Sequence, residues 1–144
     1  YDGEHVTTTH PLMSNEEFLR TYRQAWEAFY TPDHVETILR RAAACGIETG
    51  EVMKLALYCY GMQTIEGIHP LQGGLIRRKY RKDRRPAFPV ENPLVFYPRH
   101  VWETVTRSVR LFALFLRYKR ILARVEATQE KHAYTDFALS SARK

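Results

Sequence analysis

The first regular pattern of apolar and polar positions lies between residues 14 and 30 and has the spacing of a helix. Ser14 is a favourable N-cap and Glu17 stands three positions later, so the two residues form a capping box. Apolar residues then recur every three or four positions on one helical face. They are Phe18, Tyr22, Ala25, Trp26 and Phe29. We therefore expect an amphipathic first helix whose apolar stripe is buried.

Similar signals predict two further helices. Thr31 as N-cap and Pro32 at the first helical position begin the second helix, and Gly46 is a suitable left-handed residue to end it. The buried face of this helix is expected to hold Val35, Ile38, Leu39 and Ala42. A third helix is expected over residues 51–65. Because it is apolar on nearly all sides, we predict that it lies at the centre of the fold.

Prolines and glycines interrupt the pattern from residue 67 to residue 98, which predicts an irregular loop. A last amphipathic helix is expected from Pro98 to Lys131, where it would be roughly 50 Å long. Its apolar positions are predicted to pack on the domain core while its arginines remain in water. These positions are Val105, Val109, Phe112 and Leu116.

Together these elements predict an all-α fold with four main helices, an extended N-terminal arm and a long C-terminal amphipathic helix. Residues 1–13 would form the arm, residues 14–131 the helical domain, and residues 132–144 a flexible tail. At 144 residues, 44% of them apolar, the chain is long enough to bury a core of its own.

Charge is distributed unevenly along the chain, although the formal net charge is only +6. Residues 1–76 carry five Lys or Arg against ten Asp or Glu, whereas residues 77–124 carry fourteen against three. We expect the basic half to meet an anionic lipid surface or phosphate, or to fold back on acidic residues of this chain or of another domain. The residues best suited to an anionic surface are Arg77, Arg78, Lys79, Arg81, Lys82, Arg84, Arg85, Arg110, Arg117 and Arg120.

An apolar run at residues 111–116 adds lipid binding and self-association to these alternatives. Basic residues flank the run on both sides, and a helix with cationic edges and Phe and Leu on one face can lie in a membrane interface. The run also implies a second contact, whether with a partner, with lipid or with another copy of the chain. Nucleic acid is disfavoured, because the basic run at 77–85 comes without a recognised nucleic-acid-binding pattern.

The cysteines and histidines form no recognisable metal or nucleophile motif. Cys45 and Cys59 are fourteen residues apart, and no histidine stands at metal-ligand spacing from another ligand. We therefore expect no catalytic residue, metal or cofactor within this chain. No apolar run reaches the roughly 18 residues that cross a bilayer, so a cytoplasmic location is expected, with peripheral membrane contact as an option.

The first thirty residues resemble a known family. The residues that carry the resemblance are Tyr1, Asp2, Glu4, His5, Val6, Pro11, Met13, Ser14, Glu16, Glu17, Tyr22, Ala25, Trp26, Phe29 and Tyr30. This pattern is similar to the segment that follows the catalytic barrel in radical SAM proteins of the cobalamin-binding type. The resemblance implies that the chain is the C-terminal part of a larger iron–sulfur enzyme, with the upstream barrel of the same polypeptide as its partner.

The same resemblance implies that the cofactors of the full-length enzyme are bound upstream. These are an iron–sulfur cluster, S-adenosylmethionine and, in part of the family, cobalamin. The C-x-x-x-C-x-x-C motif of the cluster is absent from this sequence, so the catalytic residues of the family cannot be carried over. His5 is a candidate for a position facing the active-site mouth, the alternative being a surface or capping role.

Three functional hypotheses therefore stand. The first is a C-terminal accessory helical domain of a radical SAM enzyme, such as a methyltransferase or the anaerobic cyclase of magnesium-protoporphyrin monomethyl ester, that is not catalytic alone. The second is an independent basic helical module that binds an anionic surface, either a lipid interface or nucleic acid. The third is a homo-oligomer that assembles through the last helix.

Overall fold

The computed structural model describes residues 11–72, 76, 79–82, 88–130 and 132–142. Within these ranges the chain has five α-helices and no β-strand, which confirms the predicted all-α fold with a long helix toward the C-terminus. The helices are α1 (Asn15–Phe29), α2 (Pro32–Ala44), α3 (Thr49–Gly61), α4 (Pro93–Glu126) and the short α5 (Phe137–Ala142). Most of the predicted N-terminal arm lies outside the described residues.

The first two helices begin and end as their sequence signals predict. The backbone N–H of Glu17 donates to Ser14 Oγ at 3.2 Å, and the N–H of Ser14 donates to Glu17 Oε2 at 2.9 Å, which completes the capping box of α1. Thr31 caps α2 through a bond of 3.3 Å from the N–H of His34. Gly46 follows α2 with a φ of +70°, a left-handed conformation that favours glycine.

The third helix differs from its predicted course. Its α-helical part ends at Gly61, and residues Met62–Glu66 continue as one π-helical turn, η1. Gly67 ends that turn with a φ of +69°. The expected central position is also only partly correct, because Met53 and Ala56 are buried whereas Leu55 is 62% exposed.

The longest helix, α4, begins five residues before the predicted start and ends at Glu126 instead of Lys131. Asn92 is its N-cap, with Asn92 Oδ1 accepting from the N–H of Leu94 at 2.9 Å, and Pro93 occupies the first helical position. Pro98, the predicted start, lies inside the helix. The sequence offers two prolines, Pro93 and Pro98, at which this helix could begin. It begins at Pro93, which follows the good N-cap residue Asn92.

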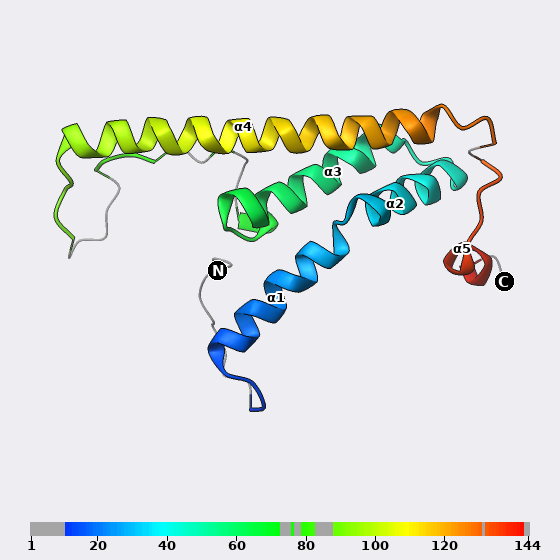
Figure 1. Cartoon of the computed structure of the whole chain (residues 1–144), viewed down its shortest axis with the longest axis horizontal. Coiled ribbons are helices and arrows are strands. Elements are labelled where there is room, and N and C mark those ends of the chain that lie inside the picture. The colour runs from blue at the N-terminus through cyan, green and yellow to red at the C-terminus, as the bar shows by residue number, and fades with distance from the viewer. Residues whose placement is uncertain (1–10, 73–75, 77–78, 83–87, 131, 143–144) are drawn as a thin grey trace.

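The hydrophobic core joins α2, α3 and the C-terminal half of α4. Figure 1 shows α2 and α3 side by side beneath that half of α4, while the N-terminal half of α4 extends beyond α3. The buried core residues are Val35, Leu39, Ala43, Met53, Ala56, Tyr118, Ile121, Leu122 and Val125. Every one of them comes from these three helices, so α2, α3 and α4 form the stable unit of the fold.

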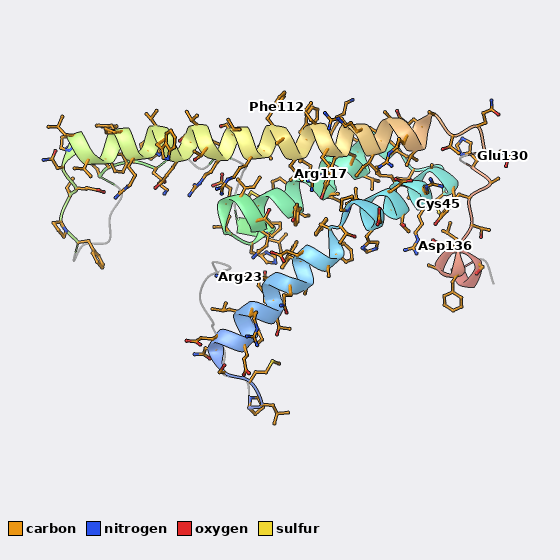
Figure 2. All side chains as sticks on the ribbon, in the orientation of Figure 1. Arg23, Cys45, Phe112, Arg117, Glu130 and Asp136 are labelled. Carbon is orange, nitrogen blue, oxygen red and sulfur yellow. The ribbon has the colours of Figure 1, made fainter. Side chains whose placement is uncertain are left out.

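The prediction of which face of α4 packs on the core is wrong. Val105, Val109, Phe112 and Leu116 lie on its outer face, with exposed fractions between 39% and 63%. Phe112 projects away from α2 and α3 (Figure 2). Two faces of this helix are apolar. Its four residues in the core cluster lie at positions 118–125, after the predicted stripe in sequence and on the opposite side of the helix. Periodicity alone therefore could not decide between the faces.

Helix α1 lies as an arm beside the three-helix core and extends away from α4 (Figure 1). Contrary to the expected burial of its stripe, α1 has no buried residue. Trp26 is half-buried, stacks on Tyr30 at a centroid distance of 5.6 Å, and meets His69 edge-on at 6.5 Å. Phe29 is 50% exposed. The described residues thus hold α1 mainly at its C-terminal end.

The predicted flexible tail contains helix α5, which is tied to α2. Asp136 Oδ1 accepts from the N–H of Leu139 at 3.1 Å, and Asp136 Oδ2 accepts from Arg41 Nε at 2.7 Å. The hydrogen bond from Arg41 is the main cause of the lowered pKa of Asp136. The contact joins residues 95 positions apart, so the sequence pattern of the tail alone gives no sign of it.

Candidate functional site: a cationic groove beside α4

The predicted basic run and His5 lie only partly within the described chain. Arg77, Arg78, Arg84, Arg85 and His5 fall outside the described residues. Of the remainder, Lys79 Nζ lies 2.6 Å from Glu103 Oε2 in α4, and Arg81 donates to the carbonyl oxygen of Glu91 at 3.0 Å. Lys82 is exposed. Lys79 and Arg81 are therefore engaged within the chain and are less suited to an external anion.

The hydrogen bond from Lys79 is the main cause of a lowered pKa at Glu103. That pair lies within the basic half, whereas two others join it to the acidic half. Arg124 in α4 lies 3.1 Å from Glu36 in α2, and Arg107 lies 3.0 Å from Glu66. Among the described residues, part of the basic half thus folds back on the acidic half. This was one of the alternatives that the charge distribution left open.

An open groove of about 270 Å³ lies between α3, η1 and α4. Its lining residues are Tyr60, Thr64, Ile65, Arg110, Ala113, Leu114 and Arg117. Arg110 and Arg117 are two helical turns apart, so both guanidinium groups lie along one wall. Among the described residues, no acidic side chain lines the groove, and none forms an ion pair with either arginine.

The groove combines charge with apolar walls. Thr64 Oγ1 donates to the carbonyl oxygen of Tyr60 at 2.6 Å, so the threonine hydroxyl retains its acceptor capacity. Ile65 and Leu114 supply apolar surface opposite each other. The arrangement suits a carboxylate or phosphate attached to a small apolar body, since guanidinium groups bind such anions in a bidentate manner.

A largely buried ion pair connects the residues next to this groove, since Glu66 follows Ile65 and Arg107 lies one turn before Arg110. Arg107 Nη1 lies 3.0 Å from Glu66 Oε2, and the side chain of Glu66 is only 2% exposed. The pair joins the π turn η1 to α4, and π turns often occur at functional sites. Glu66 is neutralised by Arg107, which leaves Arg110 and Arg117 as the uncompensated charges of the groove.

The sequence analysis selected the two arginines of this groove but missed its other wall. The structure brings Arg110 and Arg117 together and leaves Arg120, an exposed residue of α4, outside the groove. Tyr60 and Thr64 were missed because they meet Arg110 and Arg117 only through the packing of α3 and η1 against α4, which local sequence does not reveal. The available signal was the pair Gly61 and Gly67 on either side of the turn.

Three tyrosines, one of which lines the groove, lie close together. The rings of Tyr30 and Tyr60 have centroids 5.4 Å apart, and Tyr118 is 1% exposed with a hydroxyl that has no hydrogen-bond partner in the described chain. Burial raises the pKa of Tyr118. Burial, together with Cys59, raises the pKa of Tyr30 to about 12. The raised pKa values keep Tyr30 and Tyr118 neutral at physiological pH.

The histidines and cysteines of the described chain do not assemble a metal site. No group of three or more His, Cys, Asp or Glu side chains that could hold an ion occurs among the described residues. His34 Nδ1 lies 2.6 Å from the carbonyl oxygen of Phe29, and His132 Nδ1 lies 2.9 Å from that of Ala43. These two imidazoles therefore contact backbone rather than other ligands.

Comparison with known proteins does not assign this chain to a family. No family model, no curated protein and no solved structure matches it. Within the described residues, no helix combines the length and the apolar character needed to cross a membrane. The structure therefore defines the class of this protein only broadly. It is an all-α protein with a cationic groove beside a long helix.

Proposed function

We propose that this chain is a non-catalytic helical domain that docks onto the catalytic barrel of a radical SAM iron–sulfur enzyme. The proposal rests on the resemblance of the first thirty residues to the segment after such barrels. Residues of that pattern have structural roles here, since Ser14 and Glu17 cap α1, and Trp26 and Tyr30 hold it against the core. The pattern thus supports a joint between two domains rather than a reaction site.

The incomplete burial of the apolar face of α1 is the observation that carries the proposal. The helix is amphipathic, no residue of it is buried, and it extends away from the three-helix core (Figure 1). Phe29 is half exposed, although a stripe of this kind normally faces a packed partner. A barrel that precedes this chain would join it just before α1, so it is well placed to cover this face.

In this proposal the cluster, S-adenosylmethionine and any cobalamin belong to the barrel. The domain supplies packing surface, and the groove with Arg110 and Arg117 is left free to receive an anionic group. Such a domain can stabilise the barrel and shape access to it without contributing a catalytic residue.

Anaerobic cluster reconstitution tests the proposal. The coding sequence upstream of Tyr1 should contain a C-x-x-x-C-x-x-C motif, and the protein that includes it should acquire an iron–sulfur absorbance. The matched control is the isolated 144-residue chain, which should acquire none. An upstream sequence without that motif, or a stoichiometric cluster in the isolated chain, would contradict the proposal.

The groove favours a second candidate function, the binding of an anionic ligand by an independent module. Its two arginines have no acidic partner among the described residues, and its volume of about 270 Å³ suits one small anionic group with an apolar substituent. Titration with inorganic phosphate and with a phosphorylated aromatic compound should show saturable binding that Arg110→Gln and Arg117→Gln both weaken. Arg120→Gln is the matched control, and an equal effect of that change would indicate non-specific charge attraction.

A further inference from the structure

Seven residues form a continuous stripe along the outer face of α4, and no described residue covers it. The members of this α4 stripe are Val95, Pro98, Trp102, Val105, Val109, Phe112 and Leu116. Their spacing alternates between three and four residues from the first member to the last, which is the heptad pattern of a coiled coil. Trp102 is 70% exposed and Phe112 is 61% exposed. The two largest members are therefore mostly exposed and accessible to a partner.

The α4 stripe differs from the two other surfaces that a long helix can present. It lies apart from Tyr118, Ile121 and Val125, which pack on α2 and α3. Leu94, Tyr97 and Val101 are also exposed beside the N-terminal end of the stripe. Between residues 105 and 116, however, the exposed large apolar residues of α4 are stripe members alone, which gives the narrow seam of a coiled coil. A helix that lies on a membrane needs a broad apolar face along its length. The regular spacing therefore points to another helix as the occupant.

We infer that the α4 stripe is covered by α4 of a second copy of this chain, packed in the antiparallel direction. The direction follows from charge. Residues 93–106 of α4 carry one Arg and one Glu, whereas residues 107–126 carry six Lys or Arg and one Glu. A parallel pair would place the two cationic halves side by side, while an antiparallel pair places each beside the neutral half of the other copy.

The spacing also defines a register. Pairing Val105 with Val109 of the second copy places Trp102 opposite Phe112, Pro98 opposite Leu116 and Val95 opposite Lys119. At the centre, the residues that flank the seam are Thr106 and Ser108, and Thr106 of each copy faces Ser108 of the other. Both are small and uncharged, so two helices can approach there without repulsion.

The α4 stripe is large enough for a stable contact. Trp102 and Phe112 alone leave roughly 300 Å² exposed, since aromatic side chains can each bury about 150–250 Å². A standard interface buries about 800 Å² per partner. The five other members, spread over roughly 30 Å of helix, together with the flanking residues, supply the remaining area.

Sedimentation velocity over a range of chain concentrations tests the inference and is independent of any radical SAM assignment. The wild-type chain should sediment as a dimer, and Phe112→Glu should weaken association at least about tenfold, as expected for an aromatic residue at the centre of an interface. The matched control is Leu55→Glu on α3, because Leu55 is 62% exposed and lies off the stripe. That variant should still dimerise, and circular dichroism should show both variants to be helical.

Disulfide trapping tests the direction of the helices. In a Cys45→Ser, Cys59→Ala background, a mixture of Val95→Cys and Lys119→Cys chains should form a cross-linked dimer on mild oxidation. Val95→Cys alone should form none, since its two copies lie roughly 36 Å apart along an antiparallel seam. Efficient cross-linking of Val95→Cys alone would overturn the antiparallel arrangement.

Two further outcomes would overturn the inference as a whole. A wild-type chain that is monomeric at all concentrations would show that no second copy covers the α4 stripe. A monomer that binds vesicles of anionic phospholipid, and loses this binding in Phe112→Glu but not in Leu55→Glu, would assign the stripe to a lipid surface instead.

Discussion

Replacement of Tyr118 by phenylalanine should stabilise the protein. Tyr118 is 1% exposed, lies in the core between α3 and α4, and has a buried hydroxyl without a hydrogen-bond partner in the described chain. Burying a polar group without a partner costs about 1–3 kcal/mol. Because Tyr118→Phe removes that group and keeps the ring, we expect the free energy of unfolding to rise by about 1 kcal/mol.

Urea denaturation followed by circular dichroism measures this change. The matched control is Tyr58→Phe, which removes the same atom from a hydroxyl that donates to the carbonyl oxygen of Pro70 at 2.8 Å. That variant should lose about 0.5–1.5 kcal/mol. The two substitutions are chemically identical and should act in opposite directions. A loss of more than about 1 kcal/mol in Tyr118→Phe would show that the hydroxyl is hydrogen-bonded, and would refute the reasoning.

Alkaline pH provides a second readout of the same residue. Burial raises the pKa of Tyr118 above its ordinary value of 10.0, so the folded state keeps a proton that the unfolded state loses. The wild type therefore keeps its full free energy of unfolding below about pH 10, as far as Tyr118 is concerned. It loses up to about 1.4 kcal/mol per pH unit as the pH rises toward the folded pKa of Tyr118. Tyr118→Phe should lose stability less steeply than the wild type above pH 10. Equal slopes would show that Tyr118 titrates normally.

Three other predictions concern packing and ion pairs. Leu39→Ala should cost about 2–5 kcal/mol in urea denaturation and Trp26→Ala clearly less, because Leu39 is fully buried and Trp26 only half-buried; the reverse order would contradict the fold. Arg107→Met should cost about 3–5 kcal/mol by leaving Glu66 buried and unpaired, and Glu66→Gln in addition should restore part of the loss. Asp136→Asn should speed amide exchange in α5, because it removes the carboxylate that pairs with Arg41. Because the pKa of Asp136 is lowered by this contact, protonation of its carboxylate below about pH 4 should weaken the protection of α5 in the wild type as well. Unchanged protection of α5 would refute this contact.

Much of the fold follows from local signals in the sequence. The starts of α1 and α2 depend on Ser14, Thr31 and Pro32, whose effects extend over only a few residues. The start of α4 was misplaced because Pro98 was chosen over Pro93, although Asn92 before Pro93 is the better cap. Such a choice depends on a single turn and can be made from the sequence once both candidates are compared.

The parts that could not be predicted depend on tertiary contacts. Nothing in the tail indicates that Asp136 pairs with Arg41, and nothing near Glu66 indicates that Arg107 lies beside it. The face of α4 was assigned wrongly because apolar residues occur on two sides of that helix. The regular three–four spacing that ends at Leu116 was a readable sign that one of these sides has the pattern of a helix–helix seam.

Hydrogen exchange of α1 tests the central claim most directly. Amide exchange should be compared between the isolated chain and the longer protein that the proposal expects, in which a catalytic barrel precedes Tyr1. If α1 docks onto a catalytic barrel, amides of Asn15–Phe29 should exchange at least about tenfold more slowly in the longer protein, whereas those of the α2–α3–α4 core should not change. Equal exchange of α1 in the two proteins would contradict the proposed docking function.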